Sequence, residues 1–175
     1  EIIENFTADT INQQMFIITG VRGSGKTVMM TEISHKLREN DDWVVIELNP
    51  ATELLSAMLS KLNSDNICAG LINRQSSIYH FSVWSIYRGN TADYRCRDSY
   101  YKDFERLKKS GKRLLITIDE MTNSEYMKVF AGAFQIFVRQ ELPVFLLGTG
   151  LYENIEELQN EKSLTFLYRA PKIQH

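Results

Sequence analysis

The sequence predicts an α/β domain of three layers, in which helices cover both faces of a mostly parallel sheet of five strands. Two observations support this prediction. Short apolar runs alternate along the chain with segments whose apolar residues recur at helical spacing. The glycine, acidic and hydroxyl residues that could carry chemistry follow these runs, as expected for loops at the carboxyl ends of parallel strands. The length of 175 residues is that of one domain.

The expected strands are short runs that are apolar on both faces, which is typical of parallel strands covered by helices on both sides. They are MFIIT (15–19), WVVIEL (43–48), LLITID (114–119) and VFLLGT (144–149). The segment PKIQ (171–174) is expected to open a fifth strand.

Helices are expected between these runs, where apolar residues recur every three or four positions. The spacing predicts helices over 26–38, 126–138 and 152–158, one that begins at Asn49 and Pro50, and one from Asp98 to Gly111. Thr122 and Glu125 are expected to form a capping box before the helix over 126–138, which is apolar nearly all round and should be well buried. Within 64–97, the run IYHFSVWSIY (78–87) predicts a β-hairpin insertion.

The octapeptide GVRGSGKT (20–27) joins the first expected strand to the first expected helix. Glycines let the backbone turn its N–H groups toward phosphate oxygens, and the helix adds its N-terminal amides and positive dipole end. Lys26 would supply charge to the β- and γ-phosphates, and the Thr27 hydroxyl would bind Mg²⁺. The alternative is a chance glycine-rich turn. The expected phosphate-binding residues are Gly20, Val21, Arg22, Gly23, Ser24, Gly25, Lys26, Thr27 and Val28, with the Arg22 side chain in solvent by default.

An acidic pair ends the third apolar run, in LLITIDE (114–120). Asp119 is expected to hold Mg²⁺, usually through water, because magnesium dehydrates reluctantly. Glu120 is expected to accept a proton from the attacking water, a contribution of about 10²–10⁴-fold. The alternative for either residue is that it caps the next helix.

Thr149 closes the fourth apolar run, in LLGTG (146–150). A hydroxyl at this place would contact the γ-phosphate or position the water, and the alternative is an ordinary loop threonine between two glycines. The expected catalytic residues are therefore Lys26 and Glu120, the expected metal ligands are Thr27 and Asp119, and Thr149 joins the nucleotide-binding set.

These motifs resemble those of P-loop ATPases of the additional-strand, catalytic-glutamate division. GVRGSGKT resembles the Walker A motif, LLITIDE resembles Walker B with its adjacent glutamate, and VFLLGTG is similar to the sensor-1 strand. Within that division the chain resembles the AAA+ superfamily. FLYRAPKI (166–173) resembles the segment after sensor 1 in origin-recognition-like and archaeal-type ATPase domains of bacterial ATP-binding proteins.

The resemblance implies the strand order 5-1-4-3-2, with ATP and Mg²⁺ as cofactors. It makes Arg169 a candidate arginine finger that reaches a neighbouring subunit in a homo-oligomer, the alternative being a surface salt bridge. The segment FTADTINQQ (6–14) is expected near the adenine, by position alone. Because the chain lacks a helical lid, begins at Glu1 and stops in APKIQH, we expect residues 1–175 to be the AAA+-like nucleotide-binding domain of a longer protein, without its lid or effector domain.

Two functions follow from these expectations. The first is Mg²⁺-dependent ATP hydrolysis that drives or switches the conformation of a larger protein. The second is a nucleotide-dependent switch or scaffold, in signalling or with DNA, with little hydrolysis. A GTPase is disfavoured because no Asn-Lys-x-Asp follows a strand, and a small-molecule kinase because no clear basic lid is present.

The composition limits the kinds of partner and the cellular location that we expect for this protein. A net charge of −2 gives no overall attraction to nucleic acid or anionic lipid, so a protein or DNA partner would act through a missing C-terminal domain. Two cysteines predict reduced thiols and a cytoplasmic location. No run of ~18 apolar residues predicts a membrane-spanning helix.

Overall fold

A five-stranded parallel sheet forms the centre of the molecule. The computed structural model describes residues 2–8, 13–64, 104–160 and 171–174. The strands are β1 (Met15–Thr19), β2 (Trp43–Leu48), β3 (Arg113–Ile118), β4 (Val144–Gly150) and β5 (Lys172–Gln174). Their order in the sheet is β2-β3-β4-β1-β5, and all four pairings are parallel. The expected order 5-1-4-3-2 is the same order read in reverse, so the predicted topology is confirmed.

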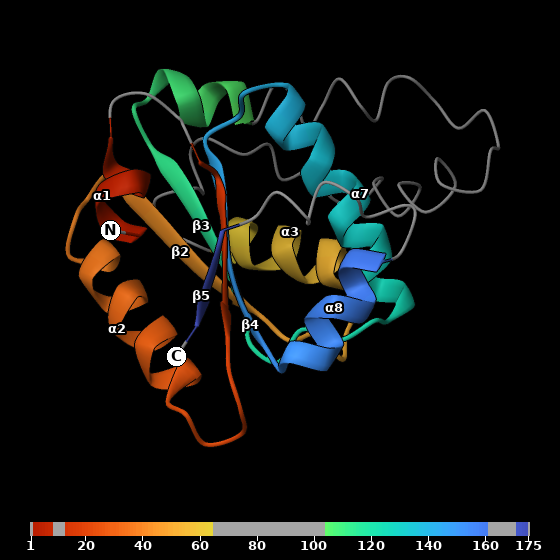
Figure 1. The fold of residues 1–175 in the computed structure, drawn as a ribbon. Helices are drawn as coiled ribbons and strands as arrows, with labels where there is room; N and C mark the ends of the chain where they lie inside the picture. The colour runs from red at the N-terminus through yellow and green to blue at the C-terminus, as the bar shows by residue number, and fades with distance from the viewer. Residues whose placement is uncertain (1, 9–12, 65–103, 161–170, 175) are drawn as a thin grey trace, which may run out of the picture.

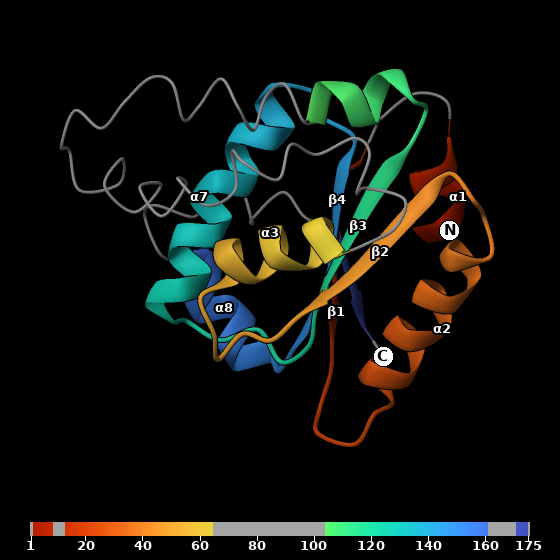
Figure 2. The same cartoon turned by 180° about the vertical axis from the view of Figure 1, so that it is seen from behind.

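Helices cover both faces of this sheet and complete the three layers (Figure 1). One face carries α1 (Ile2–Thr7) and α2 (Lys26–Arg38), and the other carries α3 (Leu54–Ser64), α7 (Glu125–Arg139) and α8 (Tyr152–Asn160). Seen from behind, α3 crosses the face opposite to α2 (Figure 2). Each face buries its own cluster of apolar side chains, and Phe104 and Leu107 of the helical segment 104–109 join the cluster under α3 and α7.

The alternation of side chains along each strand explains why both faces are apolar. In β1, Phe16 and Ile18 belong to the cluster beneath α1 and α2, whereas Met15 and Ile17 belong to the cluster beneath α3, α7 and α8. All five residues of β1 are buried. A strand in the interior of a parallel sheet must present apolar groups to two helical layers, which is why these runs are continuously apolar.

The amino terminus forms a short helix that the sequence did not predict. Phe6 of α1 is fully buried, and its ring centroid lies 5.2 Å from that of Phe16, 6.1 Å from that of Trp43 and 5.1 Å from that of Phe145. Arg113 also donates a hydrogen bond to the Phe6 carbonyl oxygen. These partners lie at or near the starts of their strands, so α1 packs at the end of the sheet opposite to the glycine loop.

The expected position of segment 6–14 near the adenine stays a prediction, although both described ends of the segment pack at the amino ends of the strands. Besides Phe6, Gln14 is buried at the same end of the sheet, where its Nε2 donates to the carbonyl oxygens of Leu142 at 2.6 Å and Val144 at 3.0 Å. These contacts tie the segment to the beginning of β4. Residues 9–12 lie outside the described part of the chain.

Two helix starts differ from the sequence expectation. Helix α3 begins at Leu54 rather than at Asn49 and Pro50, because Asn49 instead forms a turn in which its Oδ1 accepts the Ala51 N–H at 2.9 Å. The Glu53 carboxylate then accepts the N–H groups of Leu55 at 3.3 Å and Ser56 at 2.7 Å, so it caps the helix.

The cap of α7 is Ser124, so the expected capping box of Thr122 with Glu125 is wrong. The Ser124 hydroxyl accepts the Met127 N–H at 3.2 Å, and Glu125, the first helical residue, pairs with Lys128 at 3.1 Å. Helix α7 is also less buried than its composition predicts. It buries one face against the sheet, and three of its apolar side chains are exposed: Tyr126, Ile136 and Val138.

Two other expectations concern the region before β3. The predicted stop at Gly111 is confirmed: its φ is 73°, and the N–H groups of Gly111 and Lys112 bond back to Lys108 and Leu107 at 3.1 Å each. The predicted β-hairpin of 78–97 and the helix start at Asp98 lie outside the described residues.

Candidate functional site

The glycine loop connects the carboxyl end of β1 to α2 and forms one extremity of the molecule (Figure 1). Gly23 and Gly25 have φ values of 80° and 90°, a region that side chains disfavour and glycine adopts without strain. Gly25 is the N-cap residue of α2, and it has no side chain to bond the first amides of that helix. The start of α2 therefore has the geometry of an anion site.

The predicted phosphate-binding lysine is held inside this loop. Lys26 is 9% exposed, and its Nζ donates to the carbonyl oxygens of Gly20 at 3.1 Å and Val21 at 2.6 Å. The ammonium group is thus fixed within hydrogen-bond distance of the loop backbone. A phosphate bound by the loop amides would lie beside this charge.

The two predicted magnesium ligands are brought into direct contact. The Thr27 hydroxyl, in the first turn of α2, donates to Oδ2 of Asp119, which directly follows β3, at a distance of 2.9 Å. The pair supplies a hydroxyl and one carboxylate. Such a small oxygen set suits Mg²⁺, which usually completes its shell with waters and substrate phosphates.

Glu120 and Thr149 lie beside the other oxygen of Asp119. The Glu120 N–H donates to Asp119 Oδ1 at 3.1 Å and to Thr149 Oγ1 at 3.0 Å. The Thr149 hydroxyl donates to Asp119 Oδ1. Glu120 has a φ of 54°, the left-handed region that non-glycine residues rarely adopt, and its side chain is exposed.

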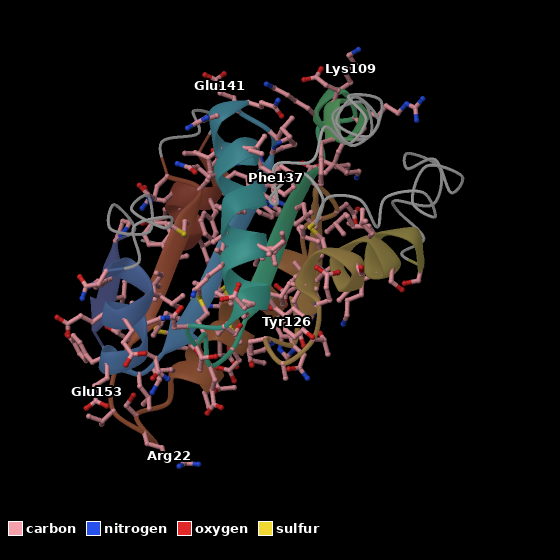
Figure 3. All side chains as sticks on the ribbon, turned by 90° about the vertical axis from the view of Figure 1, so that its right-hand side faces the viewer. Arg22, Lys109, Tyr126, Phe137, Glu141 and Glu153 are labelled. Carbon is pink, nitrogen blue, oxygen red and sulfur yellow. The ribbon has the colours of Figure 1, made fainter. Side chains whose placement is uncertain are left out.

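Several side chains of the glycine loop are exposed to solvent. Arg22 points away from the body of the protein at the tip of the loop, at the end where α8 begins with Tyr152 and Glu153 (Figure 3). Glu141 and Lys109 lie at the opposite end (Figure 3). The side chains of Val21 and Val28 are 72% and 66% exposed, and the expected solvent position of Arg22 is confirmed.

The interior of the loop offers a further polar group. Ser24 Oγ is buried and, within the described part of the chain, has no hydrogen-bond partner. Since a buried hydroxyl normally has a partner, its position in the phosphate loop fits a site that is completed by a polar ligand. Together with Lys26 and the pair of Thr27 and Asp119, this hydroxyl shows that the residues present suit a magnesium-bound nucleotide.

Sequence reasoning missed the reason for the two glycines around Thr149. A Cβ on Gly148 would lie 2.1 Å from Met121 Sδ, and a Cβ on Gly150 would lie 2.6 Å from Ile155 Cδ1. The Met121 N–H also donates to the Thr149 carbonyl oxygen at 2.8 Å. The glycine pattern GTG was the available signal that β4 approaches another segment closely.

The arginine finger stays a prediction, because Arg169 lies outside the described residues. Within the described ranges, no group of three or more His, Cys, Asp or Glu side chains is arranged to hold a metal ion. None of the described helices is both long enough and apolar enough to cross a membrane.

Comparison with known proteins supports the fold. The family model of mitochondrial ribosomal death-associated protein 3 matches residues 1–69, and no curated protein matches the sequence. Among solved structures, Cdc6p from Pyrobaculum aerophilum is similar, with a TM-score of 0.54 and 14% identity over 91% of this chain and 38% of that one. The ORC1 protein from Aeropyrum pernix, in complex with DNA, has a TM-score of 0.54 and 15% identity over 93% of this chain and 39% of its own.

A third structure, Drosophila ORC bound to DNA, has a TM-score of 0.53 and 14% identity over 92% of this chain and 37% of its own. The chain therefore spans less than two fifths of the length of each of these proteins. The finer resemblance to bacterial ATP-binding proteins stays a prediction. At these identities the similarity concerns the fold alone, a three-layer α/β domain around a five-stranded parallel sheet.

Proposed function

We propose that this domain binds Mg-ATP and hydrolyses it, and that the cycle drives or switches the conformation of a larger protein. The observation that carries the proposal is the contact of Thr27 Oγ1 with Asp119 Oδ2, at the helix start where Lys26 is held by the carbonyl oxygens of the glycine loop. A hydroxyl and a carboxylate of the types that a magnesium-bound triphosphate needs, 92 residues apart in the sequence, meet at the carboxyl end of the sheet.

Each residue has a distinct role in the proposal. The backbone amides of the glycine loop and the first turn of α2 bind the phosphates, and Lys26 turns its charge toward the β- and γ-phosphates. Thr27 and Asp119 hold Mg²⁺, which when bound neutralises charge that develops on the phosphates. The exposed Glu120 carboxylate accepts the proton of the attacking water.

Binding and turnover are tested separately. A titration with Mg-ATP should saturate for the wild-type domain and for Lys36→Ala, which removes an exposed lysine of the same helix, but not for Lys26→Ala. Equal binding by Lys26→Ala and wild type would overturn the binding site.

Glu120→Gln should retain binding and lose turnover by roughly 10²–10⁴-fold. Unchanged turnover in this variant would remove the proposed base.

The second candidate is a nucleotide-dependent scaffold or switch with little hydrolysis. It is favoured by the matching family model, whose description places that family in the mitochondrial ribosome. In this case bound nucleotide would change assembly by differential affinity for two conformations. Light scattering with and without Mg-ATP, on the full-length protein, distinguishes it: a size change without turnover supports the scaffold, and no size change opposes it.

The remaining parts of the proposal concern the whole protein. We propose a cytoplasmic location, a homo-oligomer in which Arg169 reaches the neighbouring site, and a protein or DNA partner bound through a further domain. The DNA in two of the similar structures supports this last point. Imaging of the tagged full-length protein would distinguish cytoplasm from mitochondria, and Arg169→Ala should lower turnover only in the assembled state.

A further inference from the structure

We propose that Thr149 is a positioning residue, which holds Asp119 and the backbone of Glu120 and does not contact the nucleotide. The inference rests on the proposed function and assigns a role within that site. Its basis is three hydrogen bonds that join Thr149 to three consecutive residues: its hydroxyl donates to Asp119 and accepts from the Glu120 amide, and its carbonyl accepts from the Met121 amide.

The single hydrogen that the Thr149 hydroxyl can donate is already in a hydrogen bond. A hydroxyl has one hydrogen to donate, and Thr149 donates it to Asp119 Oδ1. Its oxygen accepts the Glu120 N–H at 3.0 Å, and the residue is completely buried. A bond from this hydroxyl to a γ-phosphate would require the bond to Asp119 to break.

The two oxygens of the Asp119 carboxylate have different hydrogen-bond partners. Oδ1 is held from one side by Thr149 and by the Glu120 amide, whereas Oδ2 faces Thr27 at 2.9 Å. A carboxylate fixed in this way keeps one oxygen directed at the place where Thr27 would bind the metal. Groups that orient a metal ligand in this manner typically change metal affinity or activity by about 10- to 100-fold when they are removed.

The same hydroxyl helps to hold the unusual backbone of Glu120. A φ of 54° is disfavoured for a glutamate, so surrounding contacts must maintain it. The Glu120 amide has two acceptors, Asp119 Oδ1 and Thr149 Oγ1. This conformation sets the direction in which the Glu120 side chain leaves the loop, so Thr149 acts on the proposed base through the backbone.

Gly148 and Gly150, on either side of Thr149, allow Thr149 to lie within hydrogen-bond distance of residues 119–121. Met121 and Ile155 occupy the space that side chains on Gly148 and Gly150 would need. Strand β4 can therefore lie against residues 119–121, with Thr149 facing the acidic pair and the glycines facing the apolar side chains.

The first test needs neither a variant nor nucleotide. Hydrogen exchange followed by NMR should find the Glu120 amide protected in the wild-type domain, although its side chain is exposed. A Glu120 amide that exchanges as fast as an unstructured amide would overturn the inference. If the wild-type domain binds no nucleotide, the proposed function fails, whereas the exchange of the Glu120 amide, compared between wild type and Thr149→Val, still tests the role of Thr149.

The second test compares three variants. Thr149→Val keeps the shape but loses the hydroxyl, and Thr149→Ser keeps the hydroxyl. Thr117→Val is the matched control on the neighbouring strand, where a buried threonine donates to the Ile46 carbonyl oxygen at 3.4 Å. Thr149→Val should lose Glu120 protection and lower kcat or the apparent Mg²⁺ affinity by about 10- to 100-fold. Thr149→Ser and Thr117→Val should stay near wild type.

Two results for Thr149→Val would refute the assignment. Unchanged kcat, Mg²⁺ affinity and Glu120 protection would show that the hydroxyl positions nothing. Weaker binding of ATP but not of ADP, measured without Mg²⁺, would show instead that Thr149 contacts the γ-phosphate. If Thr149→Val does not fold, a Glu120 amide that exchanges freely in the wild-type domain would still refute the assignment.

Discussion

Gly148→Ala is expected to destabilise the domain through Met121. The added Cβ would lie 2.1 Å from Met121 Sδ and 3.5 Å from its Cγ, and Met121 is fully buried. The methionine must therefore move within a filled core, and overpacking of this kind costs about 1–3 kcal/mol. For a domain of this length each kcal/mol lowers Tm by about 2–4 °C, so we expect a decrease of about 2–12 °C.

Circular dichroism melts and urea unfolding would measure this loss, and a second substitution tests its cause. Met121→Ala alone should cost about 2–5 kcal/mol, because it leaves a cavity. In the double variant the new methyl group enters the space that Met121 leaves, so the combined loss should be smaller than the sum of the two single losses. A Gly148→Ala domain as stable as wild type, or strictly additive losses, would refute the packing described for β4.

Three further predictions concern the cap, the amino-terminal helix and the metal pair. Ser124→Ala should cost about 0.5–2 kcal/mol in urea unfolding, whereas Thr122→Ala should change stability little; the reverse ranking would restore the capping box that the structure rejects. Phe6→Ala should cost about 3–5 kcal/mol, and a loss below about 1 kcal/mol would show that α1 does not pack on the sheet. Asp119→Asn should remove most of the Mg²⁺ dependence of ATP binding in titrations with and without EDTA, and an unchanged dependence would exclude Asp119 as a metal ligand.

The strands and the glycine loop were predictable because their causes are local. Continuous apolar runs such as 15–19 and 114–118 report burial on both faces, and the short spacing from Gly20 to Thr27 defines a complete motif. The order of the strands followed from the resemblance carried by those motifs. The contact of Thr27 with Asp119 then followed from the topology, since both lie at carboxyl ends of the same sheet.

The features that escaped prediction depend on competition between nearby groups or on distant contacts. Thr122, Ser124 and Glu53 are all chemically able to cap a helix, and the choice depends on backbone geometry that the sequence does not display. Helix α1 has only six residues, too few for a periodic pattern, and is stabilised by the burial of Phe6. The bonds of Thr149 depend on how closely β4 meets the loop after β3.

The two carbonyl partners of Lys26 have a consequence for which anions the loop can select. An ammonium group has three N–H donors, and the carbonyl oxygens of Gly20 and Val21 engage two of them, so the third can bind a phosphate oxygen while both of these bonds are kept. This third bond is stronger with a multiply charged phosphate than with a singly charged anion. The loop should therefore hold the oxygens of a multiply charged phosphate more strongly than a singly charged anion such as chloride.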